Sequence, residues 1–221
     1  MSTPRWPFVV FDLDGTVVNT IPLIIASYEH AMVDVLGERP SVEDARSWIG
    51  QTLYSTFGSR HPERAQELVD SYRAWNAAHL PELLEDFPGT PRLLRALHVA
   101  GVVIGIATSK GRTPAENTLR HAGLEGLIDV TVAMEDTAAH KPNPEPLLLA
   151  VAKVGGRPEQ AAYVGDAAVD VLAAKAAGMT AIAVTWGAAS RAILEAAEPD
   201  VLVDTVAELQ ALLLPEPDEG P

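Results

Sequence analysis

A short apolar run that ends in two acids constrains this chain more than any other stretch. Phe8–Phe11 is aromatic and β-branched, which predicts a buried strand, and Asp12-Leu13-Asp14-Gly15-Thr16 follows it directly. Side chains alternate along a strand, so we expect Asp12 and Asp14 to point to the same face. Two carboxylates at a buried strand end repel each other, and a divalent cation with oxygen ligands would offset that repulsion. The alternative is an ordinary strand-to-turn junction with two incidental acids.

The rest of the chain alternates apolar segments with helical ones. Further strands are predicted over residues 102–107, 128–133, 161–164, 180–184 and 201–203. Helices are predicted from apolar spacing over residues 91–100, 113–122, 146–154 and 170–177. Strands that alternate with helices predict an α/β fold with a doubly wound, Rossmann-like parallel sheet as its core.

A long helical stretch separates the first predicted strand from the second. It begins with a helix over residues 21–36 that ends at Gly37, and it contains a later helix that opens at Pro62 and runs through Leu80. We therefore expect an all-helical cap domain, residues 18–86, inserted into an α/β core made of residues 1–17 and 87–221. Ligands of such sheets bind outside the carboxyl ends of the strands, where this cap would lie.

The composition limits the partners that the chain can have. Its formal net charge of −14 argues against binding to nucleic acid or to an anionic membrane, both of which need basic patches. An anionic substrate would need positive charge placed locally, by a metal ion and one or two basic side chains. The chain has no cysteine, and it shows no leader-like start and no apolar run long enough to span a bilayer, so we expect a cytoplasmic protein. The sequence does not indicate an oligomeric state.

Polar side chains follow the predicted strands at the edge where ligands would bind. Carboxylates, a hydroxyl and an ammonium suit metal-assisted phosphoryl transfer, in which one aspartate attacks phosphorus and a second carboxyl protonates the leaving oxygen. Each group also has a purely structural role open to it, such as helix capping or surface charge. Their joint placement favours the catalytic interpretation. The residues are Asp12, Asp14, Thr108, Lys141, Asp166 and Asp170.

In this order the motifs resemble those of the haloacid dehalogenase superfamily, phosphatase type. They are Asp12–Thr16, Thr108, Lys141-Pro142-Asn143-Pro144 and Gly165–Asp170. The resemblance implies that Asp12 is the nucleophile, that Asp14 is the general acid–base, and that Thr108 and Lys141 bind the phosphoryl group. It implies Mg²⁺ held by Asp12, by the backbone carbonyl of Asp14 and by Asp166, with Asp170 in support. Residues 18–86 resemble the helical cap of the family's first type.

Features of the sequence separate the branches of this family. The dehalogenase branch lacks the second acid, so Asp14 argues for phosphate chemistry. The phosphomutase branch has a cap arginine shortly after a cap glycine, whereas Gly50 is followed by Gln51-Thr52-Leu53. The remaining branch includes phosphoglycolate phosphatases and a bacterial inorganic pyrophosphatase. The chain is similar to the latter in the cap and over residues 186–200, which implies pyrophosphate as the small phosphorylated substrate and phosphoglycolate as the alternative. Ala167 departs from the small polar residue usual in the family.

The second anionic group of such a substrate needs donors from the cap or from the loops that face it. The candidates are Arg46, Arg73, His79 and Lys110, for which the alternative is solvated surface charge. Gly15, Thr16 and Ser109 adjoin the motifs and complete the predicted substrate-binding set.

Two other functions share part of this pattern. Receiver domains of two-component systems are also doubly wound and use a strand-end aspartate with a lysine, but they have no helical insertion after the first strand. A scaffold with a decayed site is opposed by the complete set of acids. Dinucleotide binding is excluded by the lack of a G-x-G-x-x-G motif after the first strand.

Overall fold

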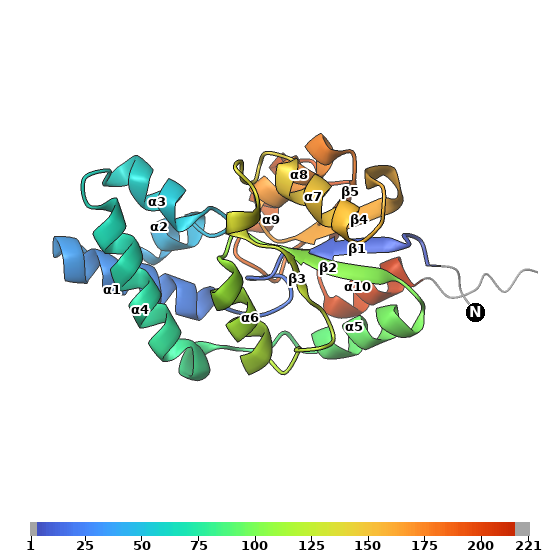
Figure 1. The fold of residues 1–221 in the computed structure, drawn as a ribbon, viewed down its shortest axis with the longest axis horizontal. Helices are drawn as coiled ribbons and strands as arrows, with labels where there is room; N and C mark the ends of the chain where they lie inside the picture. Colours follow the sequence, from blue (N-terminus) through green and yellow to red (C-terminus); the bar gives the residue numbers. More distant parts are fainter. Residues whose placement is uncertain (1–3, 215–221) are drawn as a thin grey trace, which may run out of the picture.

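A six-stranded parallel sheet forms the centre of the protein, as predicted (Figure 1). The structure, a computed structural model, describes residues 4–214. The strand order is β3-β2-β1-β4-β5-β6, so β1 lies in the middle with β2 and β4 on either side. The chain therefore switches direction across the sheet at β1, which is where doubly wound sheets place their ligands. The strands are β1 Phe8–Phe11, β2 Val103–Ala107, β3 Val130–Val132, β4 Ala161–Gly165, β5 Thr180–Val184 and β6 Val201–Val203.

Helices cover both faces of the sheet. Successive residues of β1 face opposite sides: Val9 and Phe11 join one hydrophobic core and Val10 the other. The first core is covered by α5 Thr90–Val99, α6 Arg112–His121 and α10 Val206–Leu213. The second is covered by α7 Glu145–Lys153, α8 Ala168–Ala177 and α9 Arg191–Ala196. Figure 1 shows the two groups of helices on opposite sides of the strands.

The segment between β1 and α5 forms a helical unit with its own core. Its helices are α1 Ile21–Leu36, α2 Val42–Ser47, α3 Leu53–Arg60 and α4 Ala65–Leu83. Buried aromatic rings hold them together: the ring centroid of Tyr28 lies 5.1 Å from that of Trp48, 5.5 Å from that of Phe57 and 4.9 Å from that of Tyr72. The unit lies to one side of the sheet (Figure 1).

Two neighbouring chain segments connect the helical unit to the sheet. Asn19 and Glu85 form an antiparallel bridge, and the Asn19 side chain donates a hydrogen bond of 2.7 Å to the Glu85 carboxylate. The unit thus enters and leaves the sheet at a single place, which keeps it adjacent to the end of β1.

All of the predicted strands and helices are present, and most have bounds that differ from the prediction by one or two residues. The strands β1, β5 and β6 and the helix α1 have the predicted bounds. Pro62 does not open a helix, because residues 62–64 form a turn and the first helical bond of α4 runs from Leu68 N to Arg64 O. That helix continues to Leu83 with Pro81 inside it, beyond the predicted end at Leu80.

The short helices α9 and α10 were not predicted, because six and eight residues give little periodicity. Their N-caps are nevertheless readable in the sequence, since Ser190 and Thr205 accept hydrogen bonds from the backbone three residues later. Within residues 4–214, no helix combines the length and the apolar character needed to cross a membrane.

Candidate active site

The sheet topology brings the predicted acids together. β1 pairs with β4 so that Phe11 lies opposite Val164, and Asp12 N donates to Val164 O at 2.8 Å. Asp12 and Asp166 therefore leave neighbouring strands at the same edge. Asp170 reaches them from the first turn of α8. One carboxylate oxygen from each of these three buried residues lies within 4.8 Å of the other two.

Asp14 lies outside this cluster of three carboxylates but lines the same cavity as Asp12. The strand ends at Phe11, and the chain then turns, with Gly15 at φ 84°, so strand alternation no longer applies. The Asp14 carboxylate accepts hydrogen bonds of 2.6 Å from both Lys110 Nζ and Thr20 Oγ1. The role implied for Asp14 as a metal ligand uses its backbone carbonyl and is compatible with this placement.

Lys141 is the buried counter-ion of the acids. Its Nζ donates to Asp12 Oδ1 at 2.9 Å, to Asp170 Oδ1 at 2.6 Å and to the Tyr163 hydroxyl at 3.0 Å. Burial alone would lower the pKa of Lys141, but the attraction of Asp12 and Asp170 outweighs it and holds this pKa well above its ordinary value. Lys141 is therefore charged and fixes the orientation of both carboxylates.

Asp166 is enclosed on several sides. Thr16 Oγ1 donates to its Oδ1 at 2.8 Å, and Ala188 N donates to its Oδ2 at 2.6 Å. Neighbouring glycines make room for it, since a Cβ on Gly15 would lie 2.3 Å from Asp166 Oδ2, and one on Gly187 would lie 2.2 Å from its Cβ. Desolvation and the nearby Asp170 raise the pKa of Asp166 to about 7.

The charges of this cluster suit a divalent cation. Three carboxylates against the single ammonium of Lys141 leave two negative charges uncompensated when all are ionised. Burial raises the pKa of Asp12 well above its ordinary value although Lys141 opposes the shift. The raised pKa shows that the ionised form of Asp12 is destabilised by the excess negative charge and by burial. Either protons or a divalent cation must compensate the excess charge, and oxygen ligands of this kind are those that Mg²⁺ prefers.

Asp170 and Ala167 show how the start of α8 is built. Ala167 is the buried N-cap residue and has no hydroxyl, and Asp170 Oδ2 accepts a hydrogen bond of 3.0 Å from its backbone N–H. The small side chain of Ala167 also makes room for Gly50 of the helical unit, since a Cβ on Gly50 would lie 3.1 Å from it. The start of α8 is therefore capped by Asp170, although Ala167 stands where the family usually has a polar residue.

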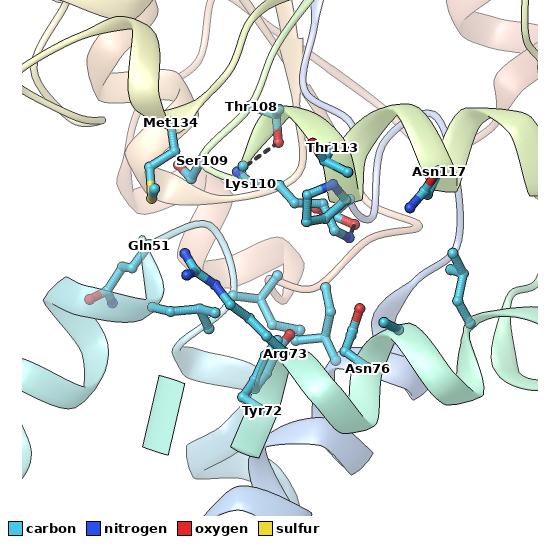
Figure 2. A pocket seen from close by; sticks show the side chains of 18 of the residues that line it. Gln51, Tyr72, Arg73, Asn76, Thr108, Ser109, Lys110, Thr113, Asn117 and Met134 are labelled. Atoms are coloured by element: carbon cyan, nitrogen blue, oxygen red, sulfur yellow. Dashed lines mark hydrogen bonds and ion pairs between the residues drawn. The ribbon is translucent and has the colours of Figure 1, made fainter. Parts of the chain in front are cut away.

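A cavity of about 340 Å³ opens in front of Asp12, between the helical unit and the strand ends. Asp14, Thr108, Ser109, Lys110 and Arg73 line it together with Asp12. Figure 2 shows Arg73 reaching from α4 toward the segment that carries Ser109 and Lys110. Ser109 Oγ donates to Gly50 O at 2.8 Å, so the helical unit is closed against the sheet at this point.

Several predicted substrate-binding residues lie elsewhere. Gly15 and Thr16 pack against Asp166 and do not line the cavity. His79 is absent from the lining, since its ring stacks on Trp75 at 3.9 Å and its Nδ1 lies 2.9 Å from Trp75 O. Arg46 Nη1 donates to Ala188 O at 3.5 Å and is likewise absent from the lining.

The helical repeat explains why Arg73 faces the cavity and His79 does not. At about 100° per residue, side chains three, four or seven positions apart share a face, and those six apart do not. Arg73 accordingly shares the cavity with Asn76, Ala77 and Leu80 of the same helix. This spacing was available in the sequence. The lining residues Thr113, Asn117 and His121 also recur every four residues along α6, but the sequence did not indicate that this face of α6 borders the cavity. The position of Met134 depends on how the segment after β3 packs.

Comparisons with known proteins agree with this geometry. The profile of the haloacid dehalogenase-like hydrolase family matches residues 9–184. Pyrophosphatase PpaX of Bacillus cereus (strain AH820) is 37% identical over 205 residues, covering 93% of this chain and 95% of that protein. The solved structure of a haloacid dehalogenase-like protein from Bacteroides fragilis superposes with a TM-score of 0.85 at 26% identity, covering 93% of this chain and 100% of the other. A predicted phosphoglycolate phosphatase from Haemophilus somnus shares the fold, with a TM-score of 0.82 at 23% identity and coverage of 93% and 96%.

The raised pKa of Asp166 predicts that a divalent cation bound at this cluster would stabilise the protein to an extent that depends on pH. A carboxyl whose pKa is raised from 3.8 to about 7 on folding makes the ion-free protein less stable as the pH rises through that interval, because the unfolded chain releases its proton first. A bound divalent cation needs the ionised carboxylates, so its stabilisation grows over the same interval. We expect the Mg²⁺-induced rise in Tm to be larger at about pH 8 than at about pH 5.5.

Thermal unfolding with and without a chelator measures this difference, with NaCl of matched ionic strength as the control. Asp166→Asn removes the titrating group and should abolish most of the Mg²⁺ effect at both pH values. An equal Mg²⁺ shift at both pH values in the unmodified chain would contradict the prediction.

Proposed function

We infer that this chain, which belongs to the haloacid dehalogenase-like hydrolases and is a phosphatase of that family, is a Mg²⁺-dependent phosphohydrolase acting through an aspartyl phosphate on a small phosphorylated substrate. The observation that carries the proposal is the placement of Asp12. Its carboxylate lines the cavity, is held by Lys141 and lies beside Asp166 and Asp170. A fixed carboxylate at the base of a cavity, next to compensating positive charge, suits nucleophilic attack on phosphorus.

The first step that we propose is attack by a carboxylate oxygen of Asp12 on the phosphorus of the bound substrate. Lys141 holds Asp12 Oδ1, which fixes the rotation of the carboxylate and favours its ionised form against the larger opposing effect of desolvation on its pKa. The bond from phosphorus to the leaving oxygen breaks as the bond to Asp12 forms. Water then cleaves the aspartyl phosphate, which releases inorganic phosphate and restores Asp12.

We assign the proton transfers of both steps to Asp14. Its carboxylate lines the cavity with Asp12, and Thr20 and Lys110 position it. We assign to Asp14 the donation of a proton to the leaving oxygen and, in the second step, the removal of a proton from the attacking water. The hydroxyl of Thr108 lines the same cavity and would donate to the phosphoryl oxygens.

Mg²⁺ held by Asp12, the carbonyl of Asp14 and Asp166, with Asp170 in support, would neutralise the phosphoryl oxygens when bound. Lys141 is buried behind Asp12 and does not line the cavity, so we assign its main role to the carboxylates. Residues 18–86 act, in this proposal, as a cap domain that excludes water during the reaction.

Inorganic pyrophosphate is the first candidate substrate. Its support is the likeness to the Bacillus cereus pyrophosphatase, whose match spans 93% of this chain. Within the cavity, Arg73 and Lys110 are the basic side chains placed to meet a second anionic group. Phosphoglycolate remains the alternative within the same mechanism.

Asp12→Asn tests the nucleophile. An amide cannot form the acyl phosphate, so we expect kcat for phosphate release to fall by more than about 100-fold, equivalent to about 2.7 kcal/mol in barrier. Phosphate release with Mg²⁺ measures the rate, circular dichroism checks the fold, and Asp86→Asn on the exposed surface is the matched control. A rate within about tenfold of the unmodified chain would rule out Asp12 as the nucleophile.

Asp14→Asn tests the general acid. An alkoxide leaves poorly without a proton, whereas nitrophenolate hardly needs one, so first-turnover rates should fall about 100-fold or more for an alkyl phosphate and much less for nitrophenyl phosphate. Rapid mixing isolates the first turnover, which keeps the hydrolysis of the intermediate out of the measurement. Equal losses for the two substrates would show that Asp14 does not protonate the leaving group.

Arg73→Ala and His79→Ala test which cap residue meets the substrate. Arg73 lines the cavity and His79 packs on Trp75, so only the first change should raise the KM for pyrophosphate, by about tenfold if a charge-assisted hydrogen bond is lost. Neither change should alter kcat strongly. The same KM increase for both variants would mean that the cap moves so as to bring His79 to the substrate.

A further inference from the structure

Much of the cavity wall is apolar, and polar side chains line the remainder. On the side of the helical unit the apolar part is formed by Ile24, Tyr28, Ile49, Leu53, Tyr72 and Leu80. Met134 and Pro114 line the opposite side. A cavity of about 340 Å³ lies at the lower end of the range of pockets that hold small organic ligands, about 300–1,000 Å³.

The tyrosines in this wall are neutral and act as ring surface. Burial raises the pKa of Tyr28 to about 12 and that of Tyr72 well above its ordinary value. The two rings lie 4.9 Å apart, centroid to centroid, and are fixed by the aromatic core of the helical unit. Tyr28 is 2% exposed and Tyr72 is 7% exposed, so the small part of the wall that they form is preformed and needs no ordering when an apolar group binds.

Positive charge is scarce in the same wall. Lys110 Nζ is held by Asp14 at 2.6 Å, and Arg73 is the cavity-lining cation contributed by α4. The guanidinium of Arg73 lies over the ring of Tyr54, with Cζ 5.3 Å from the centroid. The distal phosphoryl group of pyrophosphate would depend on Arg73 as its cationic partner from α4, whereas the apolar side chains of the wall offer it no partner.

We propose that this apolar wall is a binding site for the leaving group of organic substrates, so that the enzyme also hydrolyses phosphate monoesters of apolar alcohols. The inference rests on the proposed function. Asp12 attacks phosphorus, the ester P–O bond breaks, and the alcohol departs with the proton from Asp14. Water then releases inorganic phosphate from Asp12, which balances the reaction. The alcohol lies against the apolar wall, and Arg73 can meet a polar substituent at its far end.

A series of straight-chain alkyl phosphates tests the site. Ethyl, butyl and hexyl phosphate have leaving groups of similar basicity and differ in apolar length, so chemistry stays constant while burial changes. We expect kcat/KM with Mg²⁺ to rise with chain length, by up to about fourfold per methylene, the ratio that corresponds to ~0.8 kcal/mol. A kcat/KM that is flat or falls with length would overturn the inference while leaving phosphatase activity intact.

Ala77 and Ala78 provide a matched pair of variants. Both are exposed residues of α4, but only Ala77 lines the cavity. Ala77→Phe should fill part of the apolar space and flatten the dependence of kcat/KM on chain length. Ala78→Phe should leave the whole series unchanged. A dependence on chain length that survives Ala77→Phe would overturn the location of the site.

Binding of the matching alkyl phosphonates separates the two proposals. These compounds are not hydrolysed, so calorimetry reports affinity without turnover. Affinity that rises with chain length in a protein that hydrolyses no phosphate would support the apolar site and contradict the proposed phosphohydrolase function. Affinity independent of chain length would contradict the apolar site, whatever the enzyme hydrolyses.

Discussion

The buried ion pair of Lys141 with Asp12 and Asp170 is the interaction on which the rest of the structure depends. The Lys141 side chain is 1% exposed, and it holds carboxylates that come from the end of β1 and from the start of α8. Removing one partner of such a pair leaves an uncompensated buried charge, which typically costs about 3–5 kcal/mol. The pair therefore fixes the position of the proposed nucleophile and ties the catalytic end of the central strand to α8. Tyr163 joins the pair to β2 through its hydrogen bond of 2.9 Å to Ala107 O.

The close packing around Asp166 follows from the same concentration of charge. Each carboxylate needs donors on its remaining oxygens, and Asp166 obtains them from Thr16 and from the backbone of Ala188. Those donors can approach only because Gly15 and Gly187 lack a Cβ. The turn after β1 and the loop after β5 are thus shaped by one carboxylate, and its raised pKa shows that these hydrogen bonds do not fully offset the burial.

The sequence was sufficient to predict what depends on local pattern. Strand and helix periodicity predicted the parallel sheet, and the order of acids after successive strands predicted which residues meet. Prediction from the sequence failed where the direction of a side chain depends on the path of the backbone after a strand or helix has ended. Gly15 and Thr16 support Asp166 although they lie next to the predicted substrate site, because the chain turns directly after β1. His79 was separable from Arg73 by helical spacing alone, whereas the contribution of Met134 required the tertiary packing.

The two ends of the cavity differ in how far their residues can be substituted without loss of the proposed reaction. The phosphoryl end is built from strand ends and a buried ion pair, where each group has several partners and little freedom. The opposite wall is a stripe on α4, in which Arg73, Asn76, Ala77 and Leu80 recur at helical spacing, together with side chains from α1 and α3. Substitutions on that stripe alter size and charge without touching the nucleophile. Under the proposed function, substitutions in the helical unit would change substrate choice, and a likeness that resides in the strand-end motifs carries the reaction type further than it carries the substrate.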